Sequence, residues 1–240
     1  MRMEENVMSA QQEREFGEFQ RLRRETEITL TLKKIVVDAS GREIDRRDLK
    51  RVCGCAKKIG ASEVLVSPVT VAAAKRELGT GKVKLGCIVG GTGETLLSVK
   101  KTEAKRAAKS GAEVIRLVPC YSRLFAGNKD YVKREVKKLR KAVKKCAVIL
   151  SLEDRSLTEE QIAIGVKAAI EGKADGICVR GESPLVLKAI EASGERVRAE
   201  VSHVENSEQL RLLLKAGAQR FVSAYPQQIA EELYSGLQIG

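Results

Sequence analysis

The chain has 240 residues, of which 43% are hydrophobic, 32% are charged and 3% are aromatic, with no tryptophan and a formal net charge of +12. This composition excludes a disordered chain and is typical of a globular protein that is long enough to bury a substantial core. Because aromatic residues are scarce, the core must be built from Val, Ile, Leu and Ala, as in parallel α/β proteins whose strands are covered on both faces.

The cysteines and the single histidine exclude two further classes of protein. Six cysteines are spread through apolar runs instead of forming a disulfide framework, which is typical of reduced thiols. One histidine argues against a zinc site, and we expect neither a metal nor a cofactor. The amino-terminal stretch is too charged for a signal peptide and no apolar run reaches transmembrane length, so we expect a cytoplasmic protein with no membrane partner.

In chain order, residues 1–26 predict a helical extension, and residues 27–240 predict one domain of alternating strands and helices. Strict alternation indicates parallel strands joined by right-handed crossovers. Eight such units in about 210 residues predict a (β/α)8 TIM barrel instead of an open sheet. The expected strands are the apolar runs at 27–32, 63–67, 83–90, 113–120, 147–153, 176–180, 196–201 and 220–225.

Much of the positive charge lies on one predicted helix, over residues 128–145. Lysines and arginines surround an apolar stripe that contains Val132, Val136 and Leu139, which is typical of the solvated face of an amphipathic helix. No helix-turn-helix, zinc finger or interleaving of aromatic and basic residues is present, so we expect no specific nucleic-acid partner. The charge supports no more than non-specific attraction to polyanions.

In a barrel of this kind, the chemistry lies at the carboxyl ends of the strands. The glycine-rich stretch "VGGTGET" (89–95) follows a predicted strand but lacks the Lys-Ser/Thr of a phosphate-binding P-loop. It is either a permissive turn between strand and helix or a loop close to a ligand at the barrel mouth.

Several segments together resemble the deoxyribose-phosphate aldolase (DeoC) family of class I aldolases. They are "SEVLVSPVTVAAAKREL", "VKLGCIVGGTGETLLSVKKTEA", "SGAEVIRLV", "LTEEQI", "KADGICV", "RVRAEV" and "KAGAQRFVSA". The likeness covers nearly all of the chain after about Ile28, in the same order. The resemblance implies a TIM barrel and an enzyme that cleaves 2-deoxyribose 5-phosphate to glyceraldehyde 3-phosphate and acetaldehyde, through a Schiff base on a lysine of strand six.

The catalytic positions that the resemblance implies carry different side chains here. The strand-six lysine falls on Cys178, the second lysine, of strand seven, falls on Arg198, and the strand-four aspartate falls on Arg116. A guanidinium stays protonated and forms no imine, and a thiol adduct lacks the electron sink of an iminium. Lys33 and Lys34, after the first predicted strand, are the only lysines that we expect near the mouth.

The changed residues share strand faces with other polar side chains. Alternation places Arg180 on the same face of its strand as Cys178, and Glu200 and Ser202 on the same face as Arg198. If these faces point inward, we expect the arginines at 116, 180 and 198 to converge inside the barrel mouth with Glu200 and Glu153. They then form either an internal Arg–Glu network in a dead site or a pocket for a phosphorylated or carboxylated molecule. In either case we expect Glu200 or Glu153 to lie within salt-bridge reach of at least one of these arginines. The candidate ligand-binding residues are Arg180, Glu200, Ser202, Ser223 and Glu153.

The sequence therefore predicts an aldolase-like barrel that has lost Schiff-base chemistry and binds an anionic, phosphorylated small molecule at its carboxyl-terminal mouth. The alternative is an active aldolase or lyase that acts on 2-deoxyribose 5-phosphate, or a related sugar phosphate, through rewired residues. An anionic small molecule or sugar phosphate is the expected partner in both cases, and a homo-oligomer is compatible with the sequence.

Overall fold

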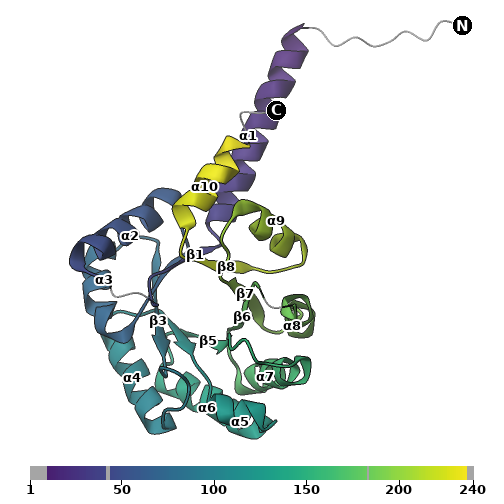
Figure 1. Cartoon of the computed structure of the whole chain (residues 1–240). Helices are drawn as coiled ribbons and strands as arrows, with labels where there is room; N and C mark the ends of the chain where they lie inside the picture. The colour runs from purple at the N-terminus through teal and green to yellow at the C-terminus, as the bar shows by residue number, and fades with distance from the viewer. Residues whose placement is uncertain (1–9, 42–43, 183, 237–240) are drawn as a thin grey trace, which may run out of the picture.

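A computed structural model describes residues 10–41, 44–182 and 184–236. Residues 1–9 of the expected amino-terminal extension lie outside the described residues. Figure 1 shows a ring of strands surrounded by helices. The helices are α1 (Ala10–Leu32), α2 (Arg46–Ile59), α3 (Val71–Leu78), α4 (Leu97–Lys109), α5 (Tyr121–Phe125), α6 (Lys129–Ala142), α7 (Glu159–Gly172), α8 (Val186–Ser193), α9 (Ser207–Lys215) and α10 (Pro226–Ser235), with a short 3-10 helix at Pro68–Thr70.

The strands form a closed, parallel barrel in sequence order, as predicted. They are β1 (Ile35–Asp38), β2 (Glu63–Val66), β3 (Lys84–Val89), β4 (Val114–Leu117), β5 (Ala147–Leu152), β6 (Gly176–Arg180), β7 (Arg198–Ser202) and β8 (Arg220–Ser223). The ring closes where β1 pairs with β8, so the sheet has no free edge.

The expected first strand, over residues 27–32, is wrong: this segment forms the last turns of α1, and β1 begins only at Ile35. Ile28 and Leu32 are one helical turn apart and both are buried against the barrel. Thr29 and Thr31, which lie between them, are accommodated in the helix because their hydroxyls donate hydrogen bonds to the backbone carbonyls four residues earlier. The boundary expected at residue 26 therefore falls inside a continuous helix.

The two faces of each strand have different surroundings. One face packs against the helices and contributes to the large apolar core, which includes Val64, Ile115 and Phe221. The other face points into the barrel, where a smaller apolar cluster is formed by Val36, Leu65, Val114, Ile149, Cys178 and Val222. Alternation along each strand then assigns every neighbouring side chain to the interior or to the helix layer.

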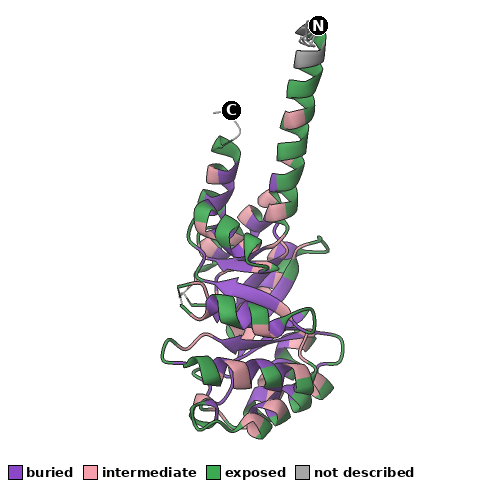
Figure 2. Cartoon of the chain, turned by 90° about the vertical axis from the view of Figure 1, so that its right-hand side faces the viewer, coloured by how far each residue is buried: buried purple, intermediate pink, exposed green. Residues whose placement is uncertain are grey.

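Helix α1 runs away from the barrel, with α10 beside its base (Figure 1). Its projecting turns are largely exposed (Figure 2), including the apolar side chains of Phe16, Phe19 and Leu22. None of the described helices is both long enough and apolar enough to cross a bilayer.

Gly86 provides the space for a charged side chain inside the barrel. A methyl group at Gly86 would approach the Glu63 carboxylate closer than 3.0 Å, and that carboxylate is held by two arginines. We predict that Gly86→Ala lowers the free energy of unfolding by about 1–3 kcal/mol through overpacking. The matched control is Gly54→Ala on α2, where no atom lies within 4 Å and the change should stabilise the helix by about 0.5–1 kcal/mol. Urea unfolding measures both; equal effects of the two substitutions would show that the interior is not tightly packed there.

Candidate active site

Inside the barrel, one arginine lies between two carboxylates. Arg116, the third residue of β4, places Nη1 2.6 Å from Oε2 of Glu200 and Nη2 3.2 Å from Oε1 of Glu63. These three side chains are at most 1% exposed. The prediction that Glu200 or Glu153 pairs with one of these arginines is confirmed by Glu200 alone. The side chains of Arg116 on β4 and Glu200 on β7 therefore both point inward.

Two further arginines complete this cluster from the amino-terminal end of the barrel. Arg198 Nε lies 2.8 Å from Glu200 Oε1, and Arg220 Nη1 lies 3.1 Å from Glu63 Oε2. Arg198 and Arg220 are the first residues of β7 and β8, so the expectation that Arg198 reaches the mouth is wrong. We call Glu63, Arg116, Arg198, Glu200 and Arg220 the interior network.

The interior network joins three guanidinium groups to two carboxylates, and these charges shift one another's pKa values. Burial alone would raise the pKa of the Glu200 carboxyl, but the guanidinium groups of Arg116, Arg198 and Arg220 bring this pKa below its usual value. Burial raises the pKa of Glu63, with Arg116 acting in the opposite direction. Burial would lower the pKa of Arg116, yet Glu200 and Glu63 hold it well above its ordinary value. Arg116 therefore stays charged, as the two carboxylates beside it require.

Cys178 lies beside this network, on the neighbouring strand β6. It is 1% exposed, pairs in register with Glu200 and belongs to the apolar cluster of the interior. Burial raises the pKa of the Cys178 thiol well above its usual value, and the carboxylate of Glu153 acts in the same direction. A protonated, buried thiol is neither a good nucleophile nor a metal ligand.

No lysine amine reaches the interior of the described barrel. Among the eight strands, Lys84 at the start of β3 is the only lysine, and it is exposed. Lys100 is fully buried, but it lies outside the barrel and pairs at 2.8 Å with Glu135. The expectation that Lys33 and Lys34 lie near the mouth is wrong, because both precede β1 and therefore lie at its amino end.

The carboxyl-terminal mouth holds a separate set of polar groups. Arg180 ends β6, is 14% exposed and pairs at 3.1 Å with Glu182, whose side chain is 42% exposed. Its register partner Ser202 ends β7 and lies with Oγ 3.0 Å from Nδ1 of His203. The Nε of Arg180 is buried and has no hydrogen-bond partner among the described residues. Arg180, Ser202 and His203 form what we call the mouth cluster.

The last two candidate residues are held by hydrogen bonds of the mouth loops. Glu153 follows β5 and accepts a short hydrogen bond from the Ser151 hydroxyl, and its backbone N–H donates to Tyr121 Oη at 3.2 Å. Ser223 shares a strand face with Phe221, which packs against the helices, and its hydroxyl accepts from the Tyr225 N–H. Ser223 therefore does not face the barrel interior.

The glycine-rich loop after β3 packs against α4 and against the segment that follows β4. The Gly90 N–H donates to Glu103 at 2.8 Å, and Gly93 lies so close to the Pro119 carbonyl that no side chain would fit there. The described residues contain no group of three or more His, Cys, Asp or Glu side chains that could hold a metal ion.

Sequence reasoning missed Glu63 and Arg220. Each of them is a charged residue at the start of an apolar run. Glu63 stands two residues before Leu65 and Arg220 stands two residues before Val222, and Leu65 and Val222 both belong to the apolar cluster inside the barrel. The period of two along a strand would have assigned both charges to the interior.

No family model matches the chain. A curated deoxyribose-phosphate aldolase of Clostridium botulinum (strain Loch Maree / Type A3) is 30% identical over 183 residues, 72% of this chain and 86% of that protein. Another, from Mycoplasmoides pirum, is 30% identical over 197 residues, 77% of this chain and 89% of that protein. The solved structure titled "QR15, an Aldolase" has a TM-score of 0.80 at 25% identity and covers 88% of this chain and 99% of its own. The deoxyribose phosphate aldolase of Aeropyrum pernix, described as a unique tetramer, has a TM-score of 0.79 at 20% identity over 95% of this chain and 99% of its own.

Arg116 is the residue on which the interior network depends. Arg116→Ala would leave Glu63 and Glu200 buried side by side without the charge between them, so we predict a loss of about 3–5 kcal/mol in the free energy of unfolding. Arg155→Ala removes an arginine whose side chain is 75% exposed, and we expect a change within about 0.5 kcal/mol. Chemical denaturation followed by circular dichroism measures both. Similar, small losses for the two variants would mean that the network does not stabilise the barrel.

Proposed function

We propose that this chain, which belongs to the deoxyribose-phosphate aldolase family, forms no Schiff base and instead binds an anionic, phosphorylated small molecule at the mouth of its barrel. One observation carries the proposal: the interior holds the Arg–Glu network and a buried thiol, and no lysine amine among the described residues reaches it.

Schiff-base chemistry needs a neutral primary amine within reach of an aldehyde. The three inward residues at the positions that the family resemblance singled out are Arg116, Cys178 and Arg198. A guanidinium remains protonated at neutral pH, and the pKa of Arg116 is raised further by its two carboxylates. The thiol of Cys178 has a raised pKa because it is buried, so it too remains protonated. None of the three supplies the nucleophile.

The mouth cluster has the chemistry of an anion site. The guanidinium of Arg180 offers fixed donors that match a phosphate, and its buried Nε has no partner among the described side chains. Ser202 adds a hydroxyl, and His203 adds a ring nitrogen beside it. Glu182 competes for Arg180, but its side chain is well exposed, so it can turn into solvent when an anion arrives.

Covalent trapping tests the first part of the proposal. Incubation with 2-deoxyribose 5-phosphate and borohydride, followed by mass spectrometry of the intact protein, should leave the mass unchanged, because no amine in the barrel can form the imine. The Clostridium botulinum relative serves as the reference protein in the same assay. A reduced adduct on any lysine of this chain, together with cleavage of the sugar phosphate, would establish the alternative of an active aldolase and overturn the proposal.

Titration with inorganic phosphate tests the second part. Arg180→Ala should weaken phosphate binding about tenfold or more, since a charge-assisted hydrogen bond contributes about 1.5–3 kcal/mol. Arg155→Ala is the matched control, because Arg155 also pairs with Glu182 but is largely exposed, and we expect its affinity for phosphate to change less than about twofold. Isothermal titration calorimetry at low salt measures both variants. Equal affinities for the two variants, or no binding by the unaltered chain, would exclude an anion site at Arg180.

A further inference from the structure

A strongly basic cleft lies at the amino-terminal end of the barrel, away from the mouth. It has a volume of about 900 Å³ and lies between α4 and α6 and the segments that lead into β4 and β5. One wall carries Lys101 and Lys105 of α4, the other carries Lys138 and Lys141 of α6, and residues 144–145 add two lysines before β5. A seventh lysine, on α3, lies at the rim. We call this feature the basic cleft.

The charge of the basic cleft is almost unopposed. Glu113 is the one carboxylate among its lining residues, and it pairs at 3.6 Å with Lys75, the lysine on α3. The other six lysines have no acidic partner within the described chain. The seven lysines less one carboxylate leave a formal charge of +6, which is half of the +12 of the whole chain.

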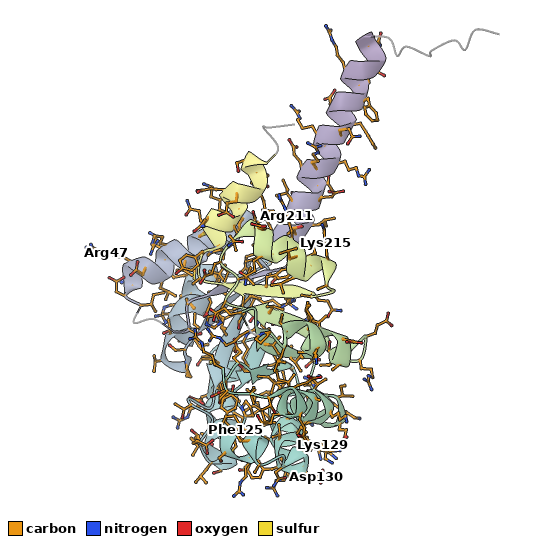
Figure 3. The ribbon with its side chains drawn as sticks, turned by 45° about the vertical axis from the view of Figure 1, so that its right-hand side comes forward. Arg47, Phe125, Lys129, Asp130, Arg211 and Lys215 are labelled. Atoms are coloured by element: carbon orange, nitrogen blue, oxygen red, sulfur yellow. The ribbon has the colours of Figure 1, made fainter. Side chains whose placement is uncertain are left out.

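The opposite side of α6 shows that this imbalance is local. There, Lys129 lies 2.7 Å and Lys133 3.3 Å from the carboxylate of Glu171 on α7, and Arg140 lies 3.3 Å from Asp175. Figure 3 labels Lys129 at the beginning of α6. Three basic residues of α6 are therefore paired with acids on the side of α7, whereas the two lysines of α6 that line the basic cleft are unpaired. Lysines that face one another across a cleft repel, and a polyanion between them would relieve that repulsion.

The lining of the cleft distinguishes between kinds of polyanion. It contains no aromatic residue and no arginine, and its apolar members are small, such as Ala108, Ala112 and Val143. Protein partners are usually anchored by aromatic or arginine side chains, which are missing here. A flat anionic membrane fits two facing walls less well than a narrow strand of phosphates that can lie between them. Flexible lysine ammonium groups suit a chain of phosphates. The absence of aromatic side chains disfavours single-stranded nucleic acid, whose unpaired bases stack on such side chains.

We propose that the basic cleft binds the sugar–phosphate backbone of double-stranded nucleic acid, without sequence preference. The cleft and the mouth cluster lie at opposite ends of the strands, so this binding is independent of the anion site proposed at Arg180. Six unpaired lysines set an upper limit on the phosphates that can be neutralised, and the salt dependence of binding reports that number directly.

The test is fluorescence anisotropy of a labelled duplex DNA with the full chain, repeated at several salt concentrations. We expect binding whose log K falls with log salt at a slope of about −3 to −5, since each neutralised phosphate contributes about −0.9. The triple variant Lys105→Gln, Lys138→Gln and Lys141→Gln should reduce the magnitude of the slope by up to about 2.7 and weaken binding at least about tenfold at 100 mM salt.

The matched control removes three other lysines that are exposed and have no acidic partner among the described residues, through Lys50→Gln, Lys167→Gln and Lys215→Gln. Lys215 lies on α9, which packs beside α10, whereas the basic cleft lies between α4 and α6. Both triple variants have the same net charge, so a difference between them reports the position of the lysines and not the total charge. The control should keep its slope, because its three lysines do not line the basic cleft. Equal losses in the two variants, or no binding by the unaltered chain at 50 mM salt, would overturn the proposal. Displacement of the DNA by poly-glutamate or by anionic vesicles at lower charge concentrations than by unlabelled duplex would overturn the choice of nucleic acid.

Discussion

The arrangement of this barrel depends on the burial of one guanidinium, that of Arg116, between two carboxylates. A charge at 1% exposure is compatible with a folded protein only if opposite charges meet it. Two strands supply these opposite charges: Glu63 is the first residue of β2, and Glu200 is the third residue of β7. Both carboxylates lie beside the guanidinium of Arg116. Gly86 leaves room for the Glu63 carboxylate, and Arg198 and Arg220 satisfy the remaining carboxylate oxygens from the amino-terminal end.

This network separates the two ends of the molecule. Apolar side chains and the interior network fill the middle of the barrel, so groups at the mouth and groups at the amino-terminal end do not share a channel through it. The mouth carries Arg180 with a buried, unpaired Nε, whereas the other end carries the basic cleft. We propose that the two ends bind anions of different size: a single phosphate group at the mouth and a polymer of phosphates at the cleft. At the cleft, Glu113 is the one carboxylate that opposes the lysines. At the mouth, the carboxylate of Glu182 opposes Arg180, and its side chain is exposed enough to turn into solvent.

Much of the fold could be predicted from the order of apolar runs. The strand at Gly176–Arg180 lies where the sequence places it, and the inward face that alternation assigns to Cys178 and Glu200 is the face that the barrel buries. The first strand could not be located in this way, because residues 27–32 fit both a strand and the end of a helix. Burial of Ile28 and Leu32 by the rest of the barrel decides between the two.

The site was harder to predict than the fold. Assigning Arg198 to the mouth failed because a strand face fixes which residues point inward but not at what height along the barrel axis each one lies. The basic residues of 128–145 were expected to form a solvated face, and along α7 they are paired with acids. The basic cleft requires α4 and α6 to be neighbours, and only the closed order of the strands brings the lysines of these two helices together.

The central claim is that the interior is closed to Schiff-base chemistry by an intact Arg–Glu network. A crystal structure of the chain soaked with 2-deoxyribose 5-phosphate tests it most directly. We predict that Arg116 bridges Glu63 and Glu200 in the soaked crystal, that Cys178 is unmodified, and that any bound sugar phosphate contacts Arg180 at the mouth. Electron density that joins the sugar covalently to a lysine, or a sugar phosphate inside the barrel with Arg116 displaced from its carboxylates, would contradict the account.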